Sequence, residues 1–204
     1  MRRGLVCADA GQAFPIYIAA VAGLLFLALA YFAVGQAAAT RSEAQTAADA
    51  AALAAALETR DRLTDEWVAN IRKPESWLDI FEGNVAVPSG CWRAHQLAAR
   101  NDATVDCQPD GPLGYTVVAE TNGTVGDTIV PGTENRKATE SATAVIEARC
   151  SFDEPAKEPE GEVLLKLSCE DGENWDLKLD DLVNLPNPED LFDVHLADSQ
   201  TNDE

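Results

Sequence analysis

Cysteine and histidine are the side chains of this sequence best suited to nucleophilic or metal chemistry. Cys91 stands in the stretch SGCW, His95 follows one helical turn later, and His195 lies much further along the chain. A cysteine beside a histidine can act as a nucleophile, and the two at this spacing on a helix can share a metal ion. Cysteine proteases of the papain type have a further cysteine shortly before the nucleophile, and SGCW lacks it. A structural metal site needs four ligands, and Cys91 with His95 supplies only two. The sequence therefore predicts no catalytic residue, no metal site and no cofactor.

A second candidate for chemistry is the acidic stretch EDGENWDLKLDD, residues 170–181. Carboxylate oxygens are calcium ligands, so weak calcium binding is one interpretation. The stretch lacks the alternating acidic pattern, central glycine and closing glutamate of a helix-loop-helix calcium site. We predict a solvated acidic face, with a weak calcium site as the alternative. No glycine-rich phosphate loop, serine elbow or metalloprotease helix is present in the sequence, so we expect a protein that is not an enzyme.

The four cysteines of the second half form an even set that allows two disulfides in three pairings, which the sequence alone does not separate. They are Cys91, Cys107, Cys150 and Cys169. We expect the sequential pairing, in which each bond closes a loop of roughly 15 to 20 residues and contributes about 3 kcal/mol. Disulfides persist in oxidising compartments, so this half of the chain is predicted to lie outside the cytoplasm.

The charge of the chain excludes one large class of partners. The formal net charge is -20, and residues 153–204 supply 14 of these charges through 17 acidic side chains and three lysines. Such a surface repels phosphate backbones and offers no basic stripe, so we expect no nucleic-acid partner. Attraction of cations and high solubility are the positive consequences.

An uncharged run of 21 residues, FPIYIAAVAGLLFLALAYFAV, extends from Phe14 to Val34. As a helix it spans roughly 30 Å, the thickness of the hydrocarbon core of a bilayer. Tyr17 and Tyr31 lie near its ends, where aromatic rings prefer the headgroup level. We predict one transmembrane helix over residues 13–35.

Basic residues on either side of this run indicate its orientation. Arg2 and Arg3 precede it and only Arg41 follows closely, which favours an N-terminus inside and a C-terminus outside. The alternative is a cleaved signal peptide, because Ala37 to Ala39 supply an A-x-A pattern. The run is longer than the usual apolar part of a signal peptide, which argues for a retained anchor.

Beyond the run, residues 36–73 are rich in good helix formers and contain no proline, so we predict that the helix continues to about Arg72. A stripe of larger apolar residues falls within an arc of about 140° on the helical wheel. Its members are Leu53, Leu57, Leu63, Trp67, Val68 and Ile71. Asp49 lies about 40° from Leu53 in the same arc. The alanine-rich part is either a spacer that packs on its own domain or a surface that packs on other subunits.

Two stretches, GQAFPIYIAAVAGLLFLALAYFAVGQAA and AQTAADAAALAAA, carry a resemblance to a known family. In this order they resemble the N-terminal region of TadE/TadG-like proteins of the tight-adherence (Flp) pilus assembly system, actinobacterial type. The matching residues are Gly11, Gln12, Gln45, Ala47, Ala48, Asp49, Ala50, Ala51, Ala52 and Leu53. The resemblance covers roughly residues 10–60.

The resemblance implies a pseudopilin-like component of pilus assembly, with other pilus-assembly or pilin-like subunits as partners. In prepilin-like members the chain is cut after a glycine that lies five residues before a glutamate. Here a cut after Gly11 places Ile16 at the glutamate position. The departure favours an assembly factor that stays in the membrane over a major pilin.

After Pro74 the pattern changes to short helices and then to strands. SWLDIFEG and CWRAHQLAARND have helical patterns, while GYTVVAET, TVGDTIV, ATAVIEARCSF, GEVLLKLSC and WDLKL have strand patterns. Asn122-Gly123 predicts a tight hairpin between the first two strands, and PEDLFDVHL predicts a last short strand. We expect an α+β fold, in which the transmembrane helix continues into a long alanine-rich helix followed by a small antiparallel β-sheet domain with two disulfides.

The predicted organisation has five parts. They are a cytoplasmic N-terminus (1–12), a transmembrane helix (13–35), an extracytoplasmic alanine-rich helix (36–73), an extracytoplasmic α+β domain (74–195) and a disordered acidic tail (196–204). The function predicted is a membrane-anchored, single-pass component of Flp/Tad-type pilus assembly. The alternative is a secreted or cell-envelope binding module, released near Ala39, with an acidic surface that binds cations.

Overall fold

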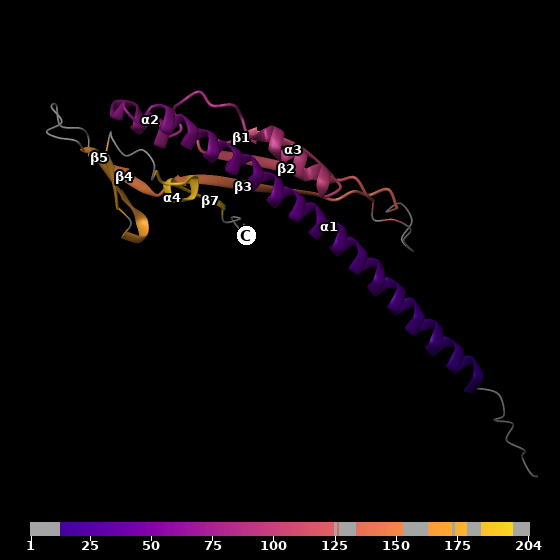
Figure 1. Ribbon diagram of the computed structural model, residues 1–204. Helices are drawn as coiled ribbons and strands as arrows, with labels where there is room; N and C mark the ends of the chain where they lie inside the picture. Colours follow the sequence, from indigo (N-terminus) through magenta and orange to yellow (C-terminus); the bar gives the residue numbers. More distant parts are fainter. Residues whose placement is uncertain are drawn as a thin grey trace, which may run out of the picture.

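The long helix expected from the sequence is present as α1 (Ala13–Ala69) in the computed structural model (Figure 1). Its 57 residues span about 85 Å. The N-terminal part extends away from the rest of the fold, and the C-terminal part lies along the strands and α3 (Cys91–Arg100). Pro15 stands in the first turn, and no further proline occurs before Pro74, so the helical hydrogen bonds continue without a break.

The structure describes residues 13–124, 126, 134–152, 163–172, 174–178 and 185–197. Several predictions fall wholly or mainly outside the described residues: the N-terminus with Gly11 and Gln12, the strand at 124–130, the loop at 153–162 and the acidic tail.

The helix α1 ends at Ala69, three residues before the predicted end. The Asn70 amide donates to the carbonyl oxygens of both Glu66 and Trp67, and the Ile71 amide donates to Val68, so the last turn tightens toward 3₁₀ spacing. The indole Nε1 of Trp77 then donates to the Asn70 carbonyl oxygen at 3.2 Å. These bonds satisfy carbonyl groups at the helix end before the chain turns at Pro74.

The larger of two antiparallel sheets has the strand order β1-β2-β3-β7. Its strands are β1 (Ala103–Pro109), β2 (Gly114–Thr121), β3 (Thr139–Ala148) and β7 (Phe192–Leu196). The strand β2 lies where the sequence predicted it. The prediction of a tight hairpin from β2 at Asn122-Gly123 was wrong, because β2 pairs with β1 on one edge and with β3 on the other.

The smaller sheet has the order β4-β5-β6, with strands β4 (Cys150–Phe152), β5 (Val163–Cys169) and β6 (Asn174–Lys178). A single strand over residues 142–152 was predicted, and that prediction was wrong. The Arg149 amide donates to the Leu191 carbonyl, and its own carbonyl accepts from the Glu170 amide. Because these groups bond outside a strand ladder, the chain leaves the large sheet at Arg149 and enters the small one.

Short helices connect these elements. The predicted ones are α2 (Trp77–Phe81), which follows the 3₁₀ helix η1 (Pro74–Ser76), and α3. The helix α4 (Pro188–Leu191) precedes β7, and the 3₁₀ helix η2 (Glu170–Gly172) follows β5. A capping box, in which the Asn187 amide donates to Asp190 Oδ2 at 2.7 Å, starts α4. The α+β fold class is confirmed.

Two disulfides hold the second half of the chain, as predicted, and both join sequential cysteines. The bond between Cys91 and Cys107 links the start of α3 to β1, with the Cα atoms 5.6 Å apart. The bond between Cys150 and Cys169 links β4 to β5, where the two residues face each other in register.

Aromatic rings fill the end of the core near α2. Trp77 packs edge-on against Trp67 and against Phe152, with both pairs of ring centroids 5.5 Å apart. Phe81 contacts Phe152 at 5.6 Å and stacks on Phe192 at 5.1 Å. These five rings join the last turns of α1 to α2, β4 and β7.

Alanines, rather than leucines, make the packing face of α1 next to the large sheet and α3. Ala44, Ala47, Ala48, Ala51, Ala52, Ala54, Ala55 and Ala56 are all buried. Of the predicted packing stripe, Leu63, Trp67 and Ile71 are buried as expected, whereas Leu57 and Val68 are 38% and 40% exposed, so the prediction was wrong for these two residues. Alanine fits the inward face because its single methyl group lets neighbouring backbones approach more closely than a leucine side chain does.

The closest approach joins α1 to the start of α3. A Cβ atom built on Gly90 would lie 2.0 Å from the carbonyl oxygen of Ala55. Gly90 has φ of -73°, which any residue adopts, so the requirement for glycine is one of space. The backbones of α1 and α3 can therefore come this close only because residue 90 has no side chain.

We predict that Gly90→Ala lowers the free energy of unfolding by about 3 kcal/mol, because the added methyl group overlaps the Ala55 backbone. Gly123→Ala is the matched control, since nothing lies within 4 Å of the added atom. Urea unfolding of the full chain in detergent micelles, followed by tryptophan fluorescence, measures both. Equal stability of the two variants would show that the close approach does not constrain the fold.

Candidate functional site

The candidate functional site is the part of α1 that joins the exposed apolar run to the domain, residues 36–59, which we call the junction segment. Before it, Phe14, Leu24, Leu27 and Tyr31 are 63–84% exposed. This helix is long and apolar enough to cross a membrane, and none of its most apolar window is buried. Within the junction segment the first buried residue is Thr40. The domain therefore begins only about 9 Å beyond Val34 along the helix axis.

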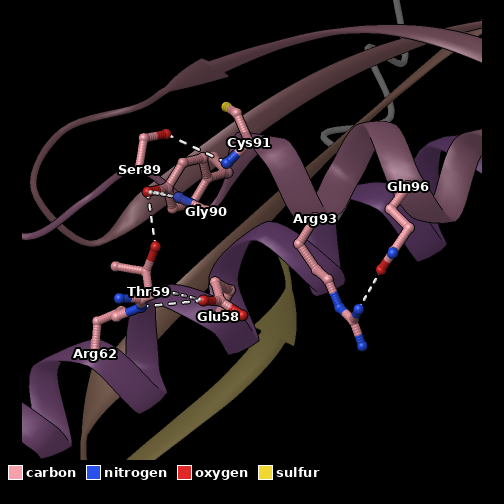
Figure 2. A network of polar contacts seen from close by, with 9 residues as sticks. Glu58, Thr59, Arg62, Ser89, Gly90, Cys91, Arg93 and Gln96 are labelled. Atoms are coloured by element: carbon pink, nitrogen blue, oxygen red, sulfur yellow. Dashed lines mark hydrogen bonds and ion pairs between the residues drawn. The ribbon is translucent and has the colours of Figure 1, made fainter.

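A buried hydrogen-bond network fastens the upper end of the junction segment. The Tyr115 hydroxyl lies 2.7 Å from the Thr59 hydroxyl and accepts a hydrogen bond from the Gly90 amide at 3.1 Å. Figure 2 shows Thr59 on α1 facing Gly90 at the start of α3. Thr59 and Tyr115 are 2% and 5% exposed. One phenol group thus joins α1, β2 and α3, and it satisfies polar groups that would otherwise be unpaired in the core.

Around this network the surface bonds are local. Figure 2 shows the ion pair of Arg62 with Glu58, one turn apart on α1, and the hydrogen bond of Arg93 with Gln96 on α3. The Ser89 hydroxyl accepts a hydrogen bond from the Cys91 amide at 3.3 Å, at the first turn of α3. These exposed pairs contribute little to stability, so the buried phenol supplies the main polar link between α1 and α3, in addition to the close packing at Gly90 and Ala55.

An ion pair fastens the lower end of the junction segment. Arg41 Nε lies 2.5 Å from Glu140 Oε1 on β3. The Thr40 hydroxyl donates to the Gln36 carbonyl oxygen at 3.1 Å within the helix. The Glu140 side chain is 20% exposed and the Arg41 side chain is 75% exposed, so this ion pair adds little to the free energy of unfolding. It links the start of β3 to α1.

The residues that carry the family resemblance divide between two faces of the helix. The alanines of AADAAALAAA, apart from the half-buried Ala50, lie on the inward face. Asp49 is half-buried, and its Oδ1 accepts a hydrogen bond from Gln45 Nε2 at 2.7 Å, one turn earlier. Leu53 is half-buried and touches the edge of the core. Gln45, Asp49 and Leu53 therefore mark the border between the inward and the outward face.

Among the described residues, Ser42, Thr46 and Leu57 are exposed on the outward face of the junction segment, next to Asp49 and Leu53. The alanines pack on the chain's own sheet and α3, as one of the two alternatives for this helix expects. The other alternative, packing on further subunits, stays a prediction for the outward face.

The structure separates the residues considered for nucleophilic or metal chemistry. Cys91 is bonded to Cys107 and has no free thiol to act as a nucleophile. His195 lies on β7, with its Nδ1 3.1 Å from Asp193 Oδ2. Within the described ranges no group of three or more cysteine, histidine or acidic residues is placed to hold a metal ion. Of the acidic stretch 170–181, Asp176 forms an ion pair with Lys166 at 3.9 Å.

Sequence reasoning missed the residues that fasten the junction segment. Thr59 and Tyr115 stand in unremarkable positions, and their pairing across 56 residues is visible only in the fold. The same holds for Arg41 and Glu140, which lie 99 residues apart. The strand β1 was also missed, although alternation of Ala103, Val105 and Cys107 on its inner face was a usable signal.

Comparison with known proteins bears on the same segment. Residues 11–58 match the model of the family described as Tad, putative Flp pilus-assembly TadE/G-like. The match covers the exposed apolar run and the junction segment up to Glu58. None of the curated proteins and none of the solved structures compared with the chain matches it. The resemblance to TadE/TadG-like proteins is thus confirmed for the N-terminal segment, and it supports involvement in Flp/Tad pilus assembly.

We predict that Thr59→Val lowers the free energy of unfolding by about 2 kcal/mol, because it removes one hydrogen-bond partner of a buried hydroxyl. In a Tyr115→Phe background the same change should cost less than half as much, since the pair acts as a unit. Thr46→Val is the control on an exposed position of the same helix. Urea titrations of the unchanged chain, the two single variants and the double variant complete the double-mutant cycle, and Thr46→Val is titrated beside them. Additive effects of Thr59→Val and Tyr115→Phe would contradict the network.

Proposed function

We propose that this chain is a non-enzymatic, membrane-anchored, pseudopilin-like component of Flp/Tad-type pilus assembly. It acts through helix packing and through an extracytoplasmic domain. The observation that carries the proposal is α1, because one unbroken helix contains both the exposed apolar run and the alanines at the centre of the domain core. The family match over residues 11–58 covers this same part of the chain.

The proposed topology has the N-terminus inside and the domain outside. Arg2 and Arg3 before the apolar run support this orientation. The two disulfides support it independently, because such bonds persist outside the cytoplasm. In this arrangement residues 1–12 are cytoplasmic, residues 13–35 span the membrane, and residues 36–195 are extracytoplasmic.

The continuity of α1 has a mechanical consequence for assembly. The junction segment is fastened to the domain at both ends, by Arg41 with Glu140 and by Thr59 with Tyr115. A displacement of the membrane helix is therefore transmitted to the whole domain without a flexible linker. We propose that other pilus-assembly or pilin-like subunits pack on the outward face of the junction segment and on the apolar run.

The mature N-terminus tests the proposal against release of the domain. We expect the membrane fraction to contain a chain that is intact or cut after Gly11, because the helix is unbroken through Ala37 to Ala39. Cell fractionation followed by mass spectrometry of the purified chain measures this. A chain that begins at Thr40 and is recovered from the medium would overturn the proposal in favour of a secreted binding module.

The outward face supplies a second prediction. Photo-crosslinkers placed at Thr46 and Leu57 should capture other membrane-anchored subunits in intact cells, because both residues are exposed on the outward face of the junction segment, about 18 and 35 Å beyond Val34 along the helix. Asp49→Lys should reduce the yield about fivefold, because it reverses the charge at the border of that face and ends the bond with Gln45.

Two controls accompany the crosslinking. Asp49→Asn keeps an acceptor oxygen toward Gln45 and should retain most of the yield. A crosslinker at Val118 on β2 is equally exposed but lies on the sheet, away from the junction segment. Equal yields from Val118 and from Leu57 would show that the outward face is not a specific contact surface.

A further inference from the structure

A groove of about 600 Å³ opens where α2 meets the start of the small sheet. Pro74, Leu78 and Phe81 form one wall, Phe152 of β4 forms the other, and Glu75 and Glu82 are also part of the lining. We call this feature the distal groove. Figure 1 places α2 and β4 at the end of the domain opposite to the exposed part of α1. The groove therefore lies far from the membrane in which α1 is anchored.

Core contacts hold the aromatic residues of the distal groove. Phe81 and Phe152 contact each other at 5.6 Å and belong to the aromatic cluster of the core. Cys150, beside Phe152, is bonded to Cys169. A site formed by core residues loses little conformational entropy on binding, which favours affinity.

An apolar side chain is left uncovered in this groove. Leu78 is 52% exposed, the highest fraction among the large apolar residues after position 34 that the structure describes. It stands on α2 next to the buried Trp77, so its position is fixed by the core. A single exposed leucine is ordinary on a protein surface, but Leu78 lines a concave site together with Pro74 and Phe152, and a concave site with a mainly apolar lining is typical of a binding pocket.

The charge of the distal groove indicates what binds there. Among the described residues, its lining contains two carboxylates, Glu75 and Glu82, and no lysine or arginine. Both residues are exposed, and Glu82 accepts a hydrogen bond from Asn84 at 3.0 Å without forming an ion pair with a described residue. The net charge of -20 strengthens the attraction for a cationic group and slows the approach of an acidic one.

We propose that the distal groove binds a segment of another protein that presents an aromatic or aliphatic side chain beside a lysine or arginine. The apolar side chain fills the space over Leu78 and Phe152, and the cation pairs with Glu75 or Glu82. This inference rests on the proposed function, because it takes the domain to lie outside the membrane in which α1 is anchored.

Other occupants fit the groove less well. A second copy of this chain brings another 20 net negative charges toward the carboxylates of Glu75 and Glu82. A lipid of the anchoring membrane is out of reach, because α2 lies at the end of the domain away from the apolar run. Nucleic acid is repelled by the same carboxylates.

The test uses the full chain in nanodiscs of zwitterionic lipid, so that neither detergent nor anionic lipid competes for the groove or for the probe. The probe is a short fluorescent peptide with a central Phe-Leu pair flanked by lysines, and its binding is followed by anisotropy. A counterpart with glutamates in place of the lysines, and one with serines in place of Phe-Leu, should both fail to bind.

Variants locate the binding. Leu78→Ser should weaken binding of the lysine peptide about tenfold, whereas Val118→Ser, an equally simple change on β2, should leave it unaltered. Glu75→Gln with Glu82→Gln should weaken binding about fivefold. The matched control removes the same charge through Asp65→Asn with Asp79→Asn, which are exposed and do not line the groove.

Three results would overturn the inference. They are equal affinity of the lysine peptide for the Leu78→Ser variant, equal weakening by the two charge-removing pairs, and self-association of the chain that Leu78→Ser abolishes while no peptide binds. Peptide binding does not depend on pilus assembly. If the peptide does not bind but crosslinking from Leu57 succeeds, the proposed function stands and the groove inference fails. If the peptide binds but crosslinking from Leu57 fails, the groove inference stands and the proposed function fails.

Discussion

The contact of α1 with α3 at Ala55 and Gly90 is the constraint on which the rest of the fold depends. With an added Cβ only 2.0 Å from the Ala55 carbonyl oxygen, the two backbones meet without side chains between them. The large sheet packs on the same helix through further alanines, so one face of α1 belongs to the core of the domain. The Cys91–Cys107 disulfide links α3 to β1, and the Tyr115 network links α3 and β2 to that helix.

Because that helix also contains the exposed apolar run, the run and the domain are one mechanical unit. A flexible linker lets the parts of a chain that it joins move independently, and α1 continues from the apolar run into the domain without such a linker. Here the domain begins about 9 Å beyond the apolar run and is fastened to the helix at Arg41 and at Thr59. The orientation of the distal groove relative to the membrane therefore follows from the orientation of α1.

The two faces of the junction segment explain why an alanine-rich pattern occurs in a functional segment. Toward the domain, methyl side chains allow close packing. On the border of that face, Gln45 and Asp49 form a hydrogen bond, and Leu53 completes the edge of the core. The segment matched by the family model, residues 11–58, thus contains both a core face and its border in a single helix. The exposed residues Ser42, Thr46 and Leu57 follow the outward face of that helix over about 23 Å.

The sequence by itself determined the elements whose cause is local. The apolar run, the unbroken helix, the strand at β2, the even set of cysteines and the family resemblance all follow from composition and spacing along the chain. The tertiary structure alone decided which face of α1 is buried, where the chain changes sheets at Arg149, and that Tyr115 reaches both Thr59 and Gly90. Those features depend on distances between residues far apart in sequence. A helical wheel ranks leucine above alanine as a packing residue. In this fold the close approach at Ala55 and Gly90 leaves no room for a larger side chain at Gly90, so alanines make the face of α1 next to α3, Leu63 and Trp67 are buried only further along the helix, and Leu57 is exposed.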